Sequence, residues 1–211
     1  EYPIIELCNP DKTEIGVLGN IKDLVISPKW GSCSEVGMTI YEKINGTVNP
    51  YYDRVLKNKL LHIDGFGYFV IQDYDETYED KVHNKTITAY SAEYMLNSKG
   101  VNLTFITTAG DINDTSSTTI VTSNYFFYRQ QQLEKSLLHQ LIKVAPLWSI
   151  GYVSPSLMGK SRSFSETDKG LYGFLTNEVS QSYEALFVFD NEDFVINAYD
   201  TTEVVKNTNI T

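Results

Sequence analysis

Alternation of apolar and polar positions predicts that the first hundred residues of this chain are mostly β-strand. Residues 35–42 carry an apolar side chain at every second position, the pattern of a half-buried strand. Between Lys59 and Asn97, three apolar or aromatic runs are separated by Asp64-Gly65 and by the acidic residues 73–80. Glycine accepts the positive φ that tight hairpin turns need. This stretch therefore predicts a three-stranded meander, closed by a short helix that begins at Ser91.

Two earlier runs supply the partner surface that a lone meander lacks. Tyr2–Leu7 is predicted to be a strand, and Asn9-Pro10-Asp11 after it is a good turn sequence. Thr13–Ile26 is a long extended run, and Gly19-Asn20 predicts a bulge or reversal within it. With the meander, these runs give about six strands and one short helix, which indicates a small β-barrel or sandwich over residues 1–100.

The second half of the chain alternates helix and strand. Leucines at helical spacing predict a helix over Gln130–Val144, and a second is predicted over Gly170–Ser182. A hairpin is expected through residues 190–193, and residues 101–123 are typical of a strand followed by a loop. The predicted fold class is α+β, mainly β: a β-barrel domain over residues 1–100, then an α+β domain over 101–211 with two helices and a β-hairpin. The abrupt end at Thr211 suggests a fragment whose second domain is incomplete at its C-terminus.

Charge narrows the possible functions. The 211 residues carry a net charge of −10, the sequence pI is about 4.7, and 42% of the residues are hydrophobic. This balance disfavours a protein that grips nucleic acid, which needs basic patches. An acidic wall would instead let DNA pass without sticking. No apolar run is long enough to predict a transmembrane helix.

The sequence contains near-matches to nucleotide- and metal-binding motifs, but each lacks a required residue. Gly159-Lys160-Ser161 resembles the end of a P-loop, but Ser154 stands where the first glycine belongs. Asp73 and Asp75 suggest a calcium loop, but Tyr78 stands where glycine is required. A solvated hairpin tip is the favoured reading there.

Histidines and cysteines give no catalytic pattern either. His62 and His83 are expected on neighbouring strands, where they could approach each other, although ordinary surface histidines are favoured. Cys8 and Cys33 are read as two small buried side chains, and a single disulfide is the minority alternative. We therefore predict no catalytic residues, no cofactor and no metal ion.

Aromatic residues are abundant: 15 Tyr, 10 Phe and 2 Trp. Such a surplus could line a sugar-binding groove, but it more often builds cores and subunit interfaces. Large aromatic side chains on loops are costly to leave exposed. The interface candidates chosen on this ground are Trp30, Tyr51, Tyr52, Tyr125, Phe126, Phe127 and Tyr128.

The order and spacing of several segments resemble a known family. These segments are CNPDK (8–12), VLG (17–19), VGMTI (36–40), NPYYD (49–53), FVI (69–71), YSAEYML (90–96), WSIGYV (148–153), RSF (162–164) and FVFD (187–190). Together they resemble the N-terminal region of phage minor structural proteins, the tail-associated or baseplate-hub proteins of siphophages.

The resemblance implies a fold similar to the contractile-tail hub protein, with a tube-like β-barrel as its first domain. It implies a homotrimer that forms a ring around the DNA channel or closes it. Its partners would be the distal tail protein, the tail tube and the tape measure protein, and DNA would pass without specific binding. The location implied is the virion tail tip of a phage or prophage, assembled in the bacterial cytoplasm and linked to host attachment.

Two other function classes remain open from the residues. The aromatic surplus would suit a carbohydrate-binding module that recognises the host cell surface. Relatives in the family carry peptidase or cell-wall hydrolase domains, but the residues of this chain predict no enzymatic activity.

Overall fold

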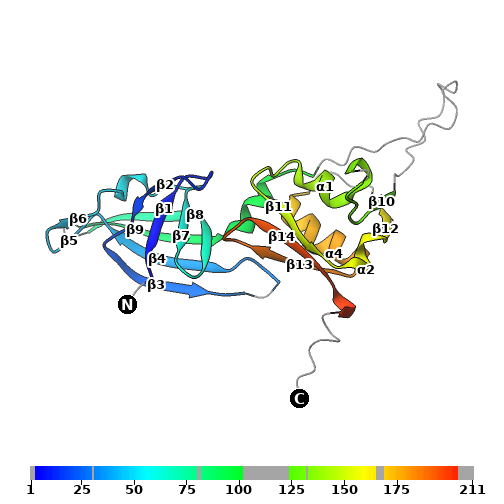
Figure 1. Cartoon of the computed structure of the whole chain (residues 1–211). Helices are drawn as coiled ribbons and strands as arrows, with labels where there is room; N and C mark the ends of the chain where they lie inside the picture. The colour runs from blue at the N-terminus through cyan, green and yellow to red at the C-terminus, as the bar shows by residue number, and fades with distance from the viewer. Residues whose placement is uncertain are drawn as a thin grey trace, which may run out of the picture. The chain divides into compact units, whose positions relative to one another are not determined.

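The computed structural model describes residues 3–29, 31–79, 82–101, 124–131, 133–164 and 169–203. The chain forms two compact units (Figure 1). The first comprises residues 1–95 with the turn 190–194, and the second comprises residues 96–189 and 195–211. The interface candidate Trp30 and the segment 102–123 lie outside the described residues.

The first unit is built on a seven-stranded sheet in the order β2-β1-β7-β8-β9-β4-β3. Every neighbouring pair in this sheet is antiparallel. Its strands are β1 (Ile5–Cys8), β2 (Glu14–Val17), β3 (Ile21–Ser27), β4 (Glu35–Tyr41), β7 (Leu60–Ile63), β8 (Gly67–Glu79) and β9 (Val82–Ser91). The smaller elements are the hairpin β5 (Lys43–Ile44) with β6 (Thr47–Val48) and the 3₁₀ helices η1 (Tyr52–Arg54) and η2 (Ala92–Ser98).

This sheet is open, so the expectation of a closed barrel was wrong. Its end strands β2 and β3 do not pair with each other. They are joined by the short link Leu18–Asn20, whose backbone bonds to the strands next to the two ends of the sheet. The N–H of Leu18 donates to Ile5 O, and Asn20 O accepts from the N–H of Tyr41. The backbones of Leu18 and Asn20 are thus bonded to β1 and β4, and no ladder forms between β2 and β3.

The meander predicted between Lys59 and Asn97 is confirmed, with one correction. The acidic stretch after Ile71 is not a loop, because β8 continues to Glu79 and pairs with β9 throughout. Tyr74 opposes Ile87 and packs against the core, whereas Tyr78 opposes His83 and is exposed. A strand with one solvent-exposed face buries only every second side chain. Carboxylates at the exposed positions therefore do not end the strand.

One hydrophobic core unites the first unit. Side chains from both ends of the sheet, including Ile15 of β2 and Leu24 of β3, pack against the same cluster. Its fully buried members include Leu7, Ile40 and Ile63. The sheet therefore wraps around a single core although its end strands are not bonded to each other.

The second unit packs short helices and strands around a smaller sheet. Its strands are β10 (Asn124–Phe126), β11 (Ser149–Val153), β12 (Ser161–Ser163), β13 (Ala185–Asp190) and β14 (Val195–Asp200). Its helices are η3 (Leu133–Lys135), α1 (Leu137–Ile142), α2 (Pro155–Met158), α3 (Leu171–Gly173), the π-helical η4 (Phe174–Val179) and α4 (Ser180–Tyr183). Strands β11, β14 and β13 form a three-stranded sheet in that order, with β11 parallel to β14, and β10 pairs with β12.

The two predicted helices have different outcomes. The second is confirmed as one continuous helical run, α3–η4–α4, and its apolar side chains Leu171, Phe174 and Val179 are buried. The helix expected over Gln130–Val144 is wrong in extent, because among the described residues of this range only 133–135 and 137–142 are helical. Buried Ser136 interrupts it.

The interruption at Ser136 has a local cause. The hydroxyl of Ser136 accepts from the N–H of Arg129 at 3.1 Å, and its backbone forms a bridge with Phe126. These contacts hold residue 136 in an extended conformation. As a result Leu133 stays 48% exposed, although the leucine pattern places it on the buried side.

Candidate functional site

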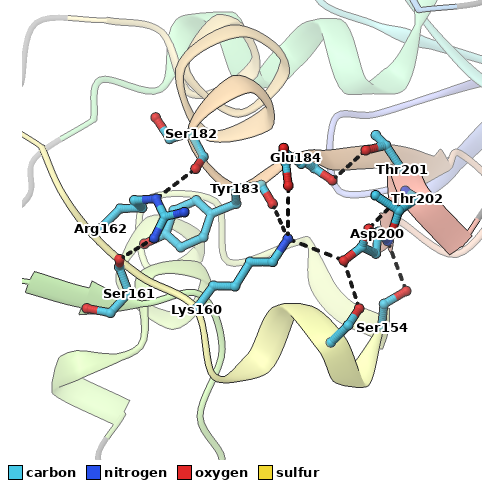
Figure 2. Close-up of polar contacts among 11 residues, drawn as sticks. Ser154, Lys160, Ser161, Arg162, Ser182, Tyr183, Glu184, Asp200, Thr201 and Thr202 are labelled. Atoms are coloured by element: carbon cyan, nitrogen blue, oxygen red, sulfur yellow. Dashed lines mark hydrogen bonds and ion pairs between the residues drawn. The ribbon is translucent and has the colours of Figure 1, made fainter.

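A connected polar cluster lies at the end of α4 in the second unit (Figure 2). The Lys160 ammonium lies 2.9 Å from Tyr183 O, 3.3 Å from Asp200 Oδ2 and 3.6 Å from Glu184 Oε2. Arg162 points to the same helix end, where its Nε donates to Ser182 O at 2.9 Å. The final carbonyls of a helix have no partner within it and attract cations. Lys160 and Arg162 therefore cap this helix.

Asp200 is the buried anion of the cluster, with 3% of its surface exposed. It accepts from the N–H and hydroxyl of Thr202 at 2.9 and 2.6 Å, and from Ser156 Oγ at 2.9 Å. These hydrogen bonds hold the pKa of Asp200 well below its ordinary range, and the two from Thr202 contribute most. A carboxylate that holds its proton so weakly is a poor general base.

The cluster therefore suits a structural clamp better than a catalytic site. The Lys160 ammonium is engaged by a carbonyl and two carboxylates, and Ser156 faces Asp200. A Ser–Lys nucleophile needs an amine that can take the serine proton, and Lys160 is not bonded to that hydroxyl. The Gly159-Lys160-Ser161 sequence, which resembled a P-loop, is thus the anchor of a helix end.

The histidines are separated rather than paired. His62 on β7 and His83 on β9 have β8 between them, so the idea that they approach each other was wrong. His62 Nδ1 lies 2.9 Å from Glu6 Oε2, and its Nε2 lies 3.1 Å from both oxygens of Glu192. His83 instead packs edge-on against Tyr78, with centroids 4.3 Å apart. No set of three or more His, Cys, Asp or Glu side chains in the described ranges is placed to hold a metal ion.

Cys8 and Cys33 form no disulfide with each other. Cys8 is buried in β1 and Cys33 is half-buried, so the disulfide alternative fails. Burial first, then the charges of Glu6 and Glu14, raise the pKa of the Cys8 thiol to about 11. A thiol held neutral is unreactive, which fits the reading of Cys8 as a small apolar side chain.

The predicted interface aromatics divide by burial. Tyr52, Tyr125 and Phe127 are at most 3% exposed and fill the cores of their units, so the exposure that motivated their choice does not arise. Tyr51 and Phe126 are half-buried, the latter under the Arg129 guanidinium at 3.4 Å from its centroid. The half-buried Tyr128 stacks on His139, with centroids 4.9 Å apart. A role at an interface stays a prediction for these last three.

The sequence analysis did not predict several other exposed apolar side chains. Tyr78 is 63% exposed and Tyr152 is 49% exposed. Leu186 and Val188 on β13 are 37% and 41% exposed. Strand alternation could have found the last two, because Phe187 between them is buried.

An open hollow of about 500 Å³ lies in the second unit. It is lined by Tyr128, Arg129, Gln130, Gln131, Met158 and Gly159. An aromatic ring, amides and a guanidinium together can hydrogen-bond and stack on a polar ligand. Among the described helices, none has the length and apolar character needed to cross a membrane.

Three solved structures with a similar fold are tail proteins, two of them from prophages. The prophage tail protein gp18 from Listeria monocytogenes EGD-e matches with a TM-score of 0.58 at 13% identity, over 92% of this chain and 50% of that one. The tail protein from Neisseria meningitidis MC58 matches with a TM-score of 0.55 at 8% identity, over 94% and 50%. The 43 kDa tail protein of prophage MuSo2 from Shewanella oneidensis matches with a TM-score of 0.52 at 8% identity, over 93% and 52%.

These likenesses concern the fold alone, since every identity is low. The chain spans about half the length of the solved structures it matches. No family model and no curated protein sequence matches it.

Proposed function

We propose that this chain is a structural component of the tail of a phage or phage-like particle. The observation that carries the proposal is the fold, shared over more than 90% of the chain with tail proteins of prophages from unrelated bacteria. The nature of the polar clusters agrees with it, because they cap helix ends and tie strands together. We extend the proposal to the absence of enzymatic activity in this region.

The more specific role that we propose is that of a hub at the tail tip. The hub would form a ring that surrounds or closes the DNA channel and would link the distal tail protein to host-contacting parts. Charge supports this role. The first unit holds 18 acidic against 9 basic side chains, a net −9, whereas the second holds 9 against 8, a net −1. An acidic wall repels phosphate and lets DNA slide past.

The partners that follow from this role are other copies of the chain, in a trimer, together with the distal tail protein, the tail tube and the tape measure protein. The particle would be assembled in the bacterial cytoplasm and would carry the protein at its tail tip. DNA would pass without specific binding.

Binding to a tail partner tests the proposal. The chain is mixed with the distal tail protein encoded nearest to it, and the mass of the mixture is measured by light scattering after size exclusion. A stable complex of both proteins is expected. Absence of a complex at high concentration, together with saturable binding to duplex DNA at low salt, would overturn the hub role.

A carbohydrate-binding module is the second candidate, favoured by the hollow beside Tyr128. Its lining combines an aromatic ring with the exposed amides of Gln130 and Gln131. Binding to purified cell-wall polysaccharide would be measured for the chain, for Gln130→Ala with Gln131→Ala, and for Gln72→Ala. Gln72 is exposed in the first unit and is the matched control. Saturable binding lost only in the double variant would favour this function over the hub.

A further inference from the structure

The turn between β13 and β14 is packed into the first unit. Residues 190–194 belong to that unit, although the chain on both sides of them belongs to the second. The N–H of Tyr68 donates to Asn191 O at 3.2 Å. Phe194 is fully buried, and the Lys12 ammonium lies 3.9 Å from its ring centroid. Backbone and side-chain contacts thus both hold this turn against β8 and the segment after β1.

The carboxyl group of Glu93 is buried next to this turn. Glu93 is 6% exposed, and its Oε1 accepts from Ser91 Oγ at 2.7 Å. Its Oε2 has no hydrogen-bond partner among the described residues. The N–H of Glu93 donates to Asn191 Oδ1 at 3.1 Å, which links the residue to the turn. Burying an ionised carboxylate with an unpartnered oxygen is costly, whereas a neutral carboxyl group is far cheaper to bury.

The cations on the neighbouring elements are engaged with partners other than Glu93. Lys29, before β4, is paired with Glu35 at 2.9 Å, and Lys12 donates to the carbonyl of Glu192. The remaining titratable side chains on these elements are tyrosines, a thiol and carboxylates: Tyr68, Tyr90, Tyr94, Cys33, Asp190, Glu192 and Asp193. None of these supplies a positive charge. Burial raises the pKa of Glu93, and the hydrogen bonds to it, that of Ser91 first, offset this only in part.

His62 is a second group whose proton holds the turn. Its Nε2 lies 3.1 Å from both carboxylate oxygens of Glu192, and its Nδ1 lies 2.9 Å from Glu6 Oε2. Only the imidazolium cation can donate from both ring nitrogens. The other titratable groups on this side are Tyr68, with its ring centroid 4.6 Å from that of His62, and Lys12, 4.9 Å from the Tyr68 centroid. Burial acts to lower the pKa of His62, but the two glutamates raise it overall.

We propose that the turn Asp190–Phe194 is a proton-dependent latch of the first unit. The latch is closed while Glu93 is a neutral acid and His62 is a cation, and it loosens as either proton is lost. The proposal goes beyond the hub role and does not rest on it, because every group involved belongs to the first unit.

Both groups make the latch tighter at low pH. The folded pKa of each lies above its unfolded value, which is about 4.3 for Glu and about 6.5 for His. The stabilisation is fully present below the unfolded pKa and is lost as pH rises through the folded pKa. The loss from Glu93 therefore begins at mildly acidic pH, and the loss from His62 begins near neutral pH.

Native-state amide exchange of the whole chain, followed by NMR from about pH 4.5 to about pH 8, tests the latch. The reporters are the N–H groups of Tyr68 and Glu93, because both donate to Asn191. Their protection, corrected for the intrinsic pH dependence of exchange, is expected to fall with rising pH by up to about tenfold per pH unit for one released proton. The N–H of Ile71, which donates to Lys59 O, is the internal control and should keep its protection.

Two glutamine variants are expected to act in opposite directions. Glu93→Gln keeps the neutral state of the closed latch, so protection at Tyr68 should stay high where the wild type begins to lose it. His62→Gln cannot carry the positive charge, so protection should already be reduced at low pH. Glu93→Ala removes the group and is expected to lower protection at every pH. Glu14→Gln changes an exposed glutamate of the first unit and should reproduce the wild-type profile.

Four results would contradict the latch: wild-type protection at Tyr68 and Glu93 that is independent of pH, an equal fall at Ile71, an unaltered fall in Glu93→Gln, or equal losses in both glutamine variants at low pH. Circular dichroism checks that each variant is folded, and the wild-type profile decides if a variant is not. The hub role is tested separately, by binding to the distal tail protein, so either proposal can fail alone.

Discussion

The ring of Tyr51 lies over Gly16, where a Cβ on residue 16 would overlap the ring carbons. Gly16 belongs to the end strand β2 and has a φ of 155°, a backbone conformation that residues with a Cβ rarely adopt. Tyr51 itself packs against the core of the first unit. The half-buried ring thus fastens an end strand of the open sheet to the segment before η1.

Gly16→Ala is therefore expected to destabilise the first unit by about 1–3 kcal/mol, because the new methyl group must displace the Tyr51 ring. The alanine would also have to adopt a backbone conformation that is strained for any residue with a Cβ. Gly19→Ala is the matched control, since a Cβ there meets open space, and its effect should stay within about 0.5 kcal/mol. Urea unfolding measures both. Equal midpoints for the two variants would contradict the contact.

His62 is expected to make the stability of the first unit depend on pH. Burial acts to lower the pKa of His62, but the hydrogen bonds and charges of Glu6 and Glu192 outweigh it and raise the pKa. Because the folded pKa lies above the unfolded value of about 6.5, His62 contributes its full stabilisation of the first unit at pH values below the unfolded pKa. It is lost as pH rises through the folded pKa.

Denaturant unfolding at several pH values between 5 and 8, roughly the range of histidine titration, tests this for wild type and His62→Gln. The variant should lose the decline in stability as pH rises. His139 is expected to have the opposite effect on the pH dependence of stability. Burial lowers the pKa of His139, so its protonation should destabilise the fold at low pH, and His139→Gln serves as the control. An unchanged profile in His62→Gln would refute the role of the two glutamates.

Asp200→Asn is expected to destabilise the second unit by about 1–3 kcal/mol, because Asp200 is buried and the donors of Thr202 and Lys160 lose its charge as their acceptor. Glu184→Gln changes the exposed partner of Lys160 and should cost less than about 1 kcal/mol. The low pKa of Asp200 also predicts a contribution that is present above the unfolded value and is lost as the solution becomes more acidic. Unfolding at neutral and acid pH measures both effects. A larger loss in Glu184→Gln would contradict the ranking.

Thiol labelling should distinguish the two cysteines. At mildly alkaline pH, the half-buried Cys33 is expected to react in the native protein, whereas buried Cys8, with a pKa of about 11, should react only after unfolding. Ellman's reagent counts the accessible thiols with and without denaturant. Cys33→Ser is the control and should abolish the native reaction. Rapid native labelling of that variant would show that Cys8 is accessible.

Elements whose pattern is local could be predicted from the amino-acid sequence. The alternation in residues 35–42 became β4, and the apolar positions of the second predicted helix are buried as expected. The meander followed from its apolar runs and its Asp64-Gly65 turn. In each case the chemistry of neighbouring residues decides the backbone, since alternation and helical spacing each bury one face whatever the partner is.

How these elements pack together depends on contacts that form only in the folded chain. The bonds of Leu18 and Asn20 to β1 and β4 leave the sheet open, and the bond from Arg129 to Ser136 breaks the first helix. The burial of Tyr52, Tyr125 and Phe127, and the exposure of Leu186 and Val188, depend on which surface packs above them. Such contacts join residues distant in the chain, or select one of several possible local hydrogen bonds. Their free energy depends on the packed environment and leaves no periodic trace in the sequence.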